Sequence, residues 1–367
     1  MHYTREDACG AWLANARLPY AAFSRLMHDF SRADAVYDAL VSSQEALDDY
    51  LDAERLTLLR SSADKASMHA MLLSLQKADV GVLSMQGSRY PDMLRNISDP
   101  PPVLFYKGDP DCLQGKCITM VGSRKASPAG IAATQKIARD FGEAGVTVVS
   151  GMAVGIDASA HTGCMDGGSP TAAVLGCGLD VDYPAEHSAL KRRLLNSGGV
   201  MLSEYPLGTR AYPGHFPVRN RLLSGLSRVV VMMECSQRSG SLSTVQHALD
   251  QGREVYAYPG DVGTPWAEGA HQLLREGANY FATAEDILSD MGWKIEKQAK
   301  RQSAKSSLPP LTEVQRRVLT AVTSGECSFD QLAAGTGLGA PELSGALTML
   351  QLMGLVKSLP GKMYAKV

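Results

Sequence analysis

The sequence contains no apolar run of the roughly 18 residues that a membrane-spanning helix requires. Residues 1–5 lead into a polar helical pattern, so the apolar core of a secretory signal is missing. The seven cysteines are scattered, odd in number and never spaced as a Cys-x-x-Cys pair. This pattern excludes the usual zinc spacings and argues against a disulfide framework. We therefore expect a protein of the reducing cytoplasm, without a metal or any other cofactor.

The sequence also lacks an excess of positive charge. It has 36 lysines and arginines against 38 aspartates and glutamates, which gives a formal net charge of −2. No global basic field would attract a nucleic acid to such a chain. Any binding of a polyanion must therefore depend on a local patch.

A recognisable catalytic set is missing as well. Gly151 and Gly155 do not form a Gly-x-Gly-x-x-Gly run, so a dinucleotide fingerprint is not supported. Ser150, Asp157 and His161 suggest a nucleophile triad, but no nucleophile elbow surrounds the serine. We expect Asp157 and His161, which share a helix face, to support a pocket through hydrogen bonds. The protein is not expected to be an enzyme.

What the sequence does contain predicts three folded parts, because 367 residues suffice for two or three domains. Apolar residues recur at helical spacing near the N-terminus, which predicts an all-helical domain of the SAM or helix-hairpin-helix type over residues 1–78. Its turns lack the Gly-x-Gly that touches phosphate in such hairpins, which favours a docked helical cap over a DNA contact. Residues 293–310 are basic and serine-rich without an apolar period, and they predict a linker.

Residues 79–292 alternate apolar runs with helical patterns. This alternation is typical of an α/β domain, and it predicts an extended Rossmann-like, doubly wound parallel sheet. The predicted strands are 117–121, 146–150, 171–175, 200–203, 228–233 and 254–258. The predicted helices are 128–142, 155–166, 186–197, 217–225, 239–251 and 268–275.

Residues 311–367 show the outline of a winged helix. Three short helical patterns, the last over residues 340–353, precede a hairpin around Pro360 and Gly361. A duplex-reading third helix normally carries basic or amide side chains, yet residues 328–355 contain no lysine or arginine. Only the expected wing is basic, through Lys357, Lys362 and Lys366. We expect a protein-contact or regulatory module, with a duplex reader as the alternative.

Small residues, hydroxyls and arginines gather where the predicted parallel strands end. The first strand ends on Gly122, followed by Ser123, Arg124 and Lys125. A guanidinium at such a turn can bind phosphate bidentately, helped by hydroxyls and by the N–H groups of a helix N-terminus. The alternative is an ion pair of Arg124 with a carboxylate such as Asp157 or Glu204. Because the carboxyl ends of parallel strands meet at one edge, we expect an anion-binding rim there.

A second group of recognition residues opens the helix predicted over 217–225. Phe216 can stack on a base, and Arg219 and Arg221 flank Asn220. The two arginines point to different helix faces, so we expect one to face the pocket and the other to support it. Surface salt bridges for both are the alternative. The remaining candidates are Ser150, Gly151, Gly155, Gly178, Lys191, Arg192, Ser239 and Gly240 for binding, and Asp157, His161 and Glu204 for pocket support.

The order of these motifs resembles the DNA-processing protein A family (DprA, also called Smf). The resemblance covers about residues 80–290. It rests on residues 121–124 (Val-Gly-Ser-Arg), 150–161 (Ser-Gly-x-Ala-x-Gly-Ile-Asp-x-x-Ala-His), 178–184 (Gly-x-Asp-x-x-Tyr-Pro), 216–221 (Phe-Pro-x-Arg-Asn-Arg), 239–241 (Ser-Gly-Ser) and 259–260 (Pro-Gly).

The resemblance implies a non-enzymatic single-stranded DNA binder. Members of this family protect incoming DNA, help to load the RecA recombinase in natural transformation, and dimerise through the Rossmann core. It also implies that Arg124 binds phosphate, with Gly151, Gly155, Arg219 and Arg221 in the same pocket. Some members carry a lysine after the Tyr-Pro pair. Residues 185–187 read Ala-Glu-His here, so Lys191 or Arg192 is expected instead.

Two other functions stay open. A nucleotide-processing enzyme of the phosphoribohydrolase type would need a Pro-Gly-Gly-x-Gly-Thr turn with a catalytic glutamate, and no such run occurs. A nucleotide-sensing transcriptional regulator would read duplex DNA through the winged helix, which the missing basic residues disfavour. For the dimer surface, strand 228–233 and helix 239–251 are the candidates.

Overall fold

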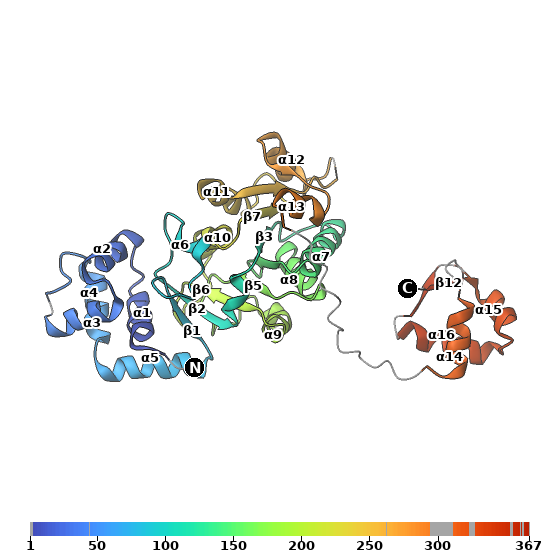
Figure 1. Cartoon of the computed structure of the whole chain (residues 1–367), viewed down its shortest axis with the longest axis horizontal. Helices are drawn as coiled ribbons and strands as arrows, with labels where there is room; N and C mark the ends of the chain where they lie inside the picture. The colour runs from blue at the N-terminus through green and yellow to red at the C-terminus, as the bar shows by residue number, and fades with distance from the viewer. Residues whose placement is uncertain are drawn as a thin grey trace. The chain divides into compact units, whose positions relative to one another are not determined.

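Apolar strands alternating with helices form a nine-stranded mixed sheet in the computed structural model (Figure 1). The structure describes residues 3–43, 45–261, 263–293, 311–322, 327–352, 355–359, 361 and 363–366. The chain divides into two units, residues 1–298 and 299–367. Most of the predicted linker therefore lies outside the described residues. The boundary predicted at residue 78 stays a prediction, since the N-terminal helices belong to the same unit as the sheet.

The N-terminal helices pack both on one another and on the sheet. Thr4 and Asp7 form a capping box at the start of α1, and Trp12 of this helix is almost fully buried in the helical cluster. Ala11 and Leu75 join a second cluster that includes Phe105 of the sheet. The helices are α1 (Arg5–Asn15), α2 (Tyr20–Phe30), α3 (Ala33–Ser42), α4 (Ala53–Ser62) and α5 (Lys65–Lys77).

The sheet has the order β1-β2-β6-β5-β4-β3-β7-β8-β9. The ladders from β6 through to β9 are parallel, whereas β1 and β2 extend the sheet antiparallel at the β6 edge. The strands are β1 (Gly81–Ser84), β2 (Val103–Gly108), β3 (Cys117–Val121), β4 (Thr147–Ser150), β5 (Thr171–Val174), β6 (Val200–Ser203), β7 (Val229–Met232), β8 (Glu254–Ala257) and β9 (Asn279–Tyr280).

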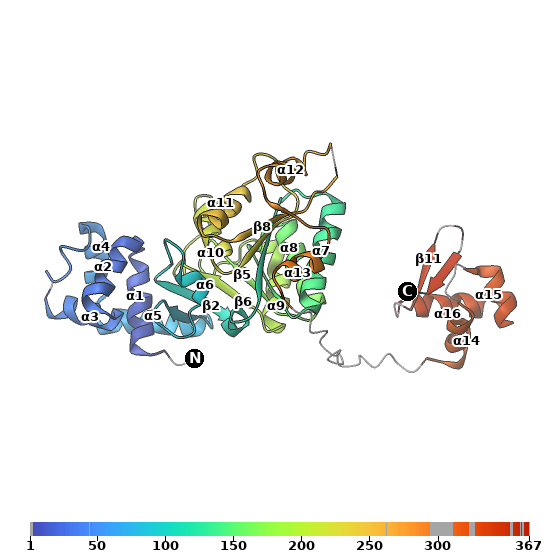
Figure 2. The ribbon, with the colours of Figure 1, turned by 45° about the horizontal axis from the view of Figure 1, so that its top comes forward.

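Helices cover both faces of the sheet, as the doubly wound prediction requires. Figure 2 shows α10 and α11 on one side of the strands and α7, α8 and α13 on the other. The helices of this part are α6 (Asp92–Arg95), α7 (Pro128–Glu143), α8 (Ile156–Asp166), α9 (Ser188–Asn196), α10 (His215–Gly225), α11 (Leu242–Asp250), α12 (Glu268–Arg275) and α13 (Ala284–Asp290), with 3-10 turns η1 (Pro110–Leu113) and η2 (Ala185–His187). The predicted strands and helices are confirmed with shifted ends, while β9 and α13 were not predicted.

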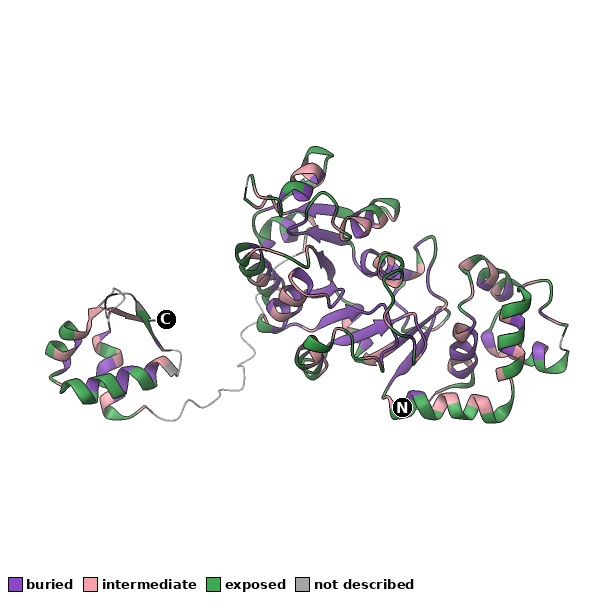
Figure 3. Ribbon diagram, turned by 180° about the vertical axis from the view of Figure 1, so that it is seen from behind, coloured by how far each residue is buried: buried purple, intermediate pink, exposed green. Residues whose placement is uncertain are grey.

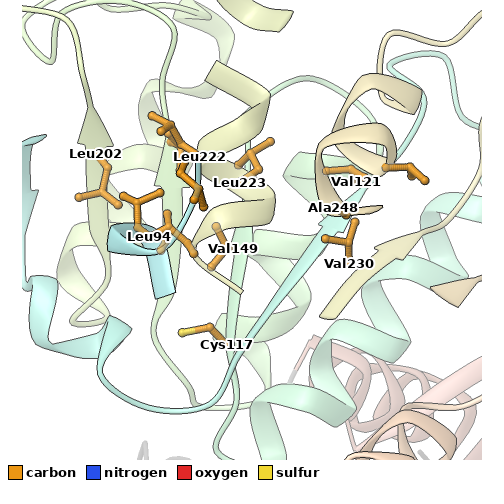
Figure 4. Packing of buried hydrophobic residues seen from close by; sticks show 14 of the residues in the cluster. Leu94, Cys117, Val121, Val149, Leu202, Leu222, Leu223, Val230 and Ala248 are labelled. Carbon is orange, nitrogen blue, oxygen red and sulfur yellow. The ribbon is translucent and has the colours of Figure 1, made fainter. Parts of the chain in front are cut away.

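Successive strand residues feed two separate apolar cores. In β7, Val230 and Met232 pack with α10 and α11, whereas Val229 and Val231 pack with α7, α8 and α13. Figure 3 shows buried strands between helices whose outer faces are exposed, and Figure 4 shows Leu222 and Leu223 of α10 packed with Val121 and Val149. Because β7 is fully buried between β3 and β8, the expectation that strand 228–233 forms a dimer surface is wrong.

The second unit has the winged-helix arrangement expected from the sequence. Its sheet has the order β10-β12-β11, and Val318, Leu332, Leu343, Leu347 and Leu350 lie in one apolar core. The predicted basic residue Lys362 and the predicted turn residue Pro360 lie outside the described residues, as does Met353. The elements are α14 (Glu313–Ala321), β10 (Cys327–Ser328), α15 (Phe329–Thr336), α16 (Ala340–Leu352), β11 (Val356–Leu359) and β12 (Met363–Lys366).

Candidate functional site

A cavity of about 660 Å³ opens at the carboxyl ends of the central strands. The chain winds from β3 through β4 and β5 to β6, then returns across β3 to β7 and β8, so the strand order reverses at β3. Open α/β folds bind ligands at such a switch point. Most of the lining residues come from the segments directly after β3, β7 and β8 and from the start of α10. Ala153 and Asp157 follow β4, and Tyr183 follows β5. It consists of Val121, Gly122, Ser123, Arg124, Lys125, Ala153, Asp157, Tyr183, Pro213, Phe216, Pro217, Arg219, Asn220, Leu223, Ser236, Ser239, Gly240, Ser241, Thr244, Pro265 and Trp266.

The loop after β3 is fixed by Glu234, which follows β7. The Glu234 backbone oxygen accepts from Ser123 N at 2.6 Å, and its carboxylate accepts from Ser127 N at 2.7 Å and Ser127 Oγ at 2.6 Å. Ser127 in turn caps α7 by accepting from Gly130 N at 2.9 Å. Gly122 must be small, because a Cβ there would lie 2.6 Å from Ile156 and 2.8 Å from the Glu234 oxygen. The strand ends thus set the position of Arg124.

Arg124 is exposed and lies at the mouth of the cavity. Its guanidinium carbon is 5.4 Å from the centroid of the Phe216 ring, a cation–π contact. The carboxylates proposed as alternative partners are engaged elsewhere: Glu204 binds Arg221, and Asp157 faces buried N–H groups and Arg219. Arg124 therefore keeps its N–H donors available to an anion, together with the neighbouring ammonium of Lys125.

In the lining of the cavity, a buried arginine (Arg219) and a buried carboxylate (Asp157) flank Gly151. The Asp157 carboxylate accepts from Gly151 N at 3.2 Å and from Ala153 N at 3.3 Å. A Cβ on Gly151 would lie 2.1 Å from Arg219 Nη1 and 2.7 Å from Asp157 Oδ2, so only glycine fits between them. Gly151 also lines a smaller cavity of about 90 Å³, which shares Arg124, Phe216 and Arg219 with the larger one.

Burial dominates the electrostatics of this pair. The side chain of Arg219 is 4% exposed, and its Nη1 donates to Val174 O at 2.7 Å while its Nε has no hydrogen-bond partner. Burial lowers the pKa of Arg219, and the charge of Asp157 opposes this shift. Burial likewise raises the pKa of Asp157, and the charge of Arg219 opposes that shift. Each charge therefore offsets part of the cost of burying the other.

Hydroxyl groups form the wall contributed by residues 236–244, after β7. Ser239 Oγ and Ser241 Oγ lie 2.7 Å apart, and Asn220 Nδ2 donates to Ser243 Oγ at 2.8 Å. The Thr244 hydroxyl is buried in the lining without a hydrogen-bond partner. Uncharged hydroxyl groups thus line the same cavity as the cations Arg124 and Lys125 of the loop after β3.

Arg221 does not line the cavity with Arg219, contrary to what the resemblance implies. Its Nη1 and Nη2 donate to the two Glu204 carboxylate oxygens at 2.9 Å and 2.8 Å, and its Nε donates to Asp99 O at 3.1 Å. The expectation that one arginine faces the pocket and the other serves as support matches this geometry. Arg221 thereby ties α10 to Asp99 and to Glu204, which follows β6.

The basic helix residues proposed after the Tyr-Pro pair also lie outside both cavities. The Lys191 ammonium is buried and donates to Asp182 Oδ1 at 2.9 Å and to Pro184 O at 3.2 Å. Arg192 is exposed on α9. Gly178 and Gly155 are needed for the close packing of loops. A Cβ on Gly178 would lie 2.7 Å from Pro206 O. Gly155 has a φ of +79°, and a Cβ there would lie 2.5 Å from Ser123 O.

Ser150 and His161 form no catalytic triad. Ser150 Oγ donates to Met120 O at 2.7 Å inside the sheet. His161 is fully buried, and its Nδ1 lies 2.7 Å from Thr171 Oγ1. Because the Thr171 hydroxyl donates to Val148 O at 2.6 Å, it accepts from His161, which places the ring hydrogen on Nδ1. Burial lowers the pKa of His161 to about 3, helped by His187 and Arg219. A neutral, enclosed imidazole is a structural group.

Several residues of the site were not among the candidates proposed from the sequence, including Glu234, Thr244 and Trp266. Glu234 was not a candidate, although a lone carboxylate directly after a buried parallel strand is itself a signal. Thr244 closes a hydroxyl-rich run whose first members were proposed. Trp266 follows β8 on the loop that lies at the same edge of the sheet, and an aromatic in such a loop could have been included on topology alone.

Neither a metal centre nor a membrane span emerges from the part of the chain that the structure describes. No group of three or more His, Cys, Asp or Glu side chains there could hold a metal ion. Within the same residues, no helix is long and apolar enough to cross a bilayer.

Comparison with known proteins places this geometry in one family. The model described as DNA recombination-mediator protein A matches residues 81–292, and the model described as DprA winged helix domain matches residues 302–362. The chain is 34% identical to Protein Smf of Synechocystis over 310 residues, covering 76% of this chain and 78% of the relative. It is 33% identical to Protein Smf of Escherichia coli over 307 residues, covering 82% and 81%.

Solved structures agree. DNA processing protein A of Streptococcus pneumoniae has a TM-score of 0.60 at 30% identity, covering 79% of this chain and 99% of that one. DNA processing protein A of Helicobacter pylori, whose structure addresses a single-stranded DNA binding mode, has a TM-score of 0.52 at 26% identity, covering 58% and 95%. The chain belongs to the DNA recombination-mediator protein A family, known by the names DprA and Smf.

Proposed function

We propose that the cavity binds the backbone of single-stranded DNA, with Arg124 as its principal phosphate contact. The observation that carries this proposal is the exposed Arg124 guanidinium at the cavity mouth, which lies over Phe216 and whose candidate carboxylate partners bind other groups. Lys125 adds a second cation, and Ser239 and Ser241 add hydroxyl donors. The H. pylori relative, whose structure concerns single-stranded DNA binding, supports the same choice of ligand.

Rings in the lining favour an unpaired strand over a duplex. Phe216 and Tyr183 line the cavity beside Arg124, with their ring centroids 5.6 Å apart. Sequence-independent single-strand binders combine cations that follow the backbone with rings that receive exposed bases. A duplex hides the faces of its bases, so it would use the cations alone.

The proposed role is binding rather than catalysis. Asp157, the carboxylate in the lining of the large cavity, is engaged by two backbone N–H groups and by Arg219. From the family resemblance we propose that the protein protects incoming DNA and loads the RecA recombinase during natural transformation, as a cytoplasmic homodimer formed through the Rossmann core. Leu249 of α11, 58% exposed, is a candidate dimer contact, and light scattering with Leu249→Asp tests it.

Fluorescence anisotropy with labelled oligonucleotides tests the central proposal. Single-stranded and duplex oligonucleotides of the same sequence are titrated with the unaltered protein, with Arg124→Ala and with Arg193→Ala. Arg193 is a matched control, because it is also an exposed arginine but pairs with Asp166 away from the cavity. We expect preference for the single strand, a loss of affinity in Arg124→Ala and little change in Arg193→Ala. Equal affinity for the duplex, or an unaffected Arg124→Ala variant, would contradict the proposal.

A further inference from the structure

We propose that Trp266 stacks on a nucleobase, so that the cavity holds a base as well as a backbone phosphate. This inference rests on the proposed single-strand binding and specifies what the ligand presents to the loop after β8. Trp266 lines the same cavity as Arg124 and Phe216.

The backbone beside Trp266 is held in place by close contacts. Gly269 N donates to Cys235 O at 2.9 Å, and a Cβ on Gly269 would lie 2.6 Å from the Cys235 sulfur, so the start of α12 lies tightly against the end of β7. Ala267 is 1% exposed. Gly260, at a φ of +59°, would bring a Cβ within 3.1 Å of the Ala267 methyl group. These contacts therefore hold the backbone that carries the Trp266 side chain in place.

The ring itself has no aromatic or cationic partner among the described residues, unlike the other rings of the cavity. Phe216 contacts both Arg124 and Tyr183. Trp266 is 41% exposed, although its neighbour Ala267 is buried. An indole left open beside two cations and several hydroxyls fits a ligand that combines negative charge with flat rings, which describes a nucleotide strand. Stacking of a base on an aromatic side chain strengthens binding by about 5- to 100-fold.

Tryptophan fluorescence gives a direct readout, because the chain has only three tryptophans. Trp12 is buried among the N-terminal helices, and Trp293 packs beside the α13 core. The probes are a single strand of thymidylates and an abasic strand of equal length, which carries the same phosphates without bases. The variants are Trp266→Ala, Trp266→Phe and, as a control, Trp293→Phe, each checked for folding by circular dichroism.

We expect the thymidylate strand to quench the fluorescence of the unaltered protein and of Trp293→Phe, but not that of Trp266→Phe. Trp266→Ala should lower affinity for the thymidylate strand about 5- to 100-fold without changing affinity for the abasic strand, and Trp266→Phe should retain most of it. Equal quenching by the abasic strand, or unchanged thymidylate affinity in Trp266→Ala, overturns the inference while phosphate binding stands. Failure of both strands to bind would refute the proposed function itself. Fluorescence that changes with protein concentration alone would instead assign Trp266 to contact with a second copy.

Discussion

At the scale of single residues, the cavity lining contains two buried side chains of opposite charge, Arg219 and Asp157. Arg219 and Asp157 each lie on one side of Gly151, and burial disfavours the charged form of both. Arg219 thereby stabilises the charge of Asp157 at the start of α8, while Arg124 is the proposed contact with the ligand. The two arginines of the pocket have different tasks, and they should respond differently to substitution.

Arg219→Met should lower the free energy of unfolding by about 3–5 kcal/mol, because it leaves the Asp157 carboxylate buried without a compensating charge. Adding Asp157→Asn should recover part of this loss, since an amide oxygen can still accept from Gly151 N and Ala153 N. Urea unfolding of the single and double variants measures both effects. An Arg219→Met variant as stable as the unaltered protein would show that the pair contributes no such coupling.

His161 predicts a pH dependence of stability. Its pKa falls from 6.5 to about 3 on folding because of burial, so the unfolded chain binds more protons between these values. The stability provided by the neutral ring is present above pH 6.5 and is lost as the pH falls towards 3, at up to about 1.4 kcal/mol per pH unit.

Comparison of the unaltered protein with His161→Gln isolates this effect, with the exposed His28→Gln as control. Asp157, whose pKa is raised, acts in the opposite direction at low pH, so the difference between proteins is the readout rather than the absolute slope. His161→Gln should lose less stability on acidification than either other protein. Parallel curves for all three would contradict the assignment.

At the scale of elements, the contact of Glu234, directly after β7, with Ser127, at the N-terminus of α7, holds the loop of Arg124 in place. Glu234 binds Ser127 at the α7 N-terminus through its carboxylate and Ser123 through its backbone oxygen. Gly130 lies directly under that carboxylate, where a Cβ would be 2.2 Å from the carboxyl carbon. The position of this loop therefore depends on Glu234, which is not among the residues that line the cavity.

Gly130→Ala should lower the free energy of unfolding by about 1–3 kcal/mol, although alanine is otherwise the better helix former. It should also weaken single-strand binding, because Glu234 must move and release the loop of Arg124. Gly115→Ala is the matched control, since a Cβ there meets nothing within 4 Å. Thermal unfolding and anisotropy check both variants. If Gly130→Ala proved as stable and as tightly binding as Gly115→Ala, Glu234 would not be the support described.

The elements were predictable from the sequence where their periodicity was strong. The parallel strands read as continuous apolar runs because both of their faces are buried. Because the carboxyl ends of parallel strands lie at the same edge of the sheet, the edge that carries the candidate site was predictable as well. The division of labour between Arg219 and Arg221 was predicted, but not which of them faces the cavity, since that depends on how α10 rotates against the sheet. Lys191 was misplaced because its burial against Asp182 depends on the fold of the preceding turn.

At the scale of the whole molecule, we expect different roles for the two units: DNA binding for residues 1–298 and protein contact for residues 299–367. The cations of the proposed site belong to residues 1–298, where net charge alone gave no indication of a binding surface. The winged-helix unit has its own apolar core, and residues 328–355 contain no lysine or arginine. These features continue to favour a protein-contact role for that unit. The proposed binding therefore rests on a local patch of cations and not on the global charge.

The salt dependence of single-strand binding tests the central claim most directly. Each phosphate contact with a single strand contributes a slope of about −0.7 to log K against log salt concentration. The account predicts that Arg124→Ala makes this slope shallower by about 0.7 and weakens binding whatever the base sequence, whereas Arg193→Ala keeps the slope of the unaltered protein. A slope unchanged in Arg124→Ala, or reduced equally in Arg193→Ala, would contradict the claim that Arg124 binds a backbone phosphate in this cavity.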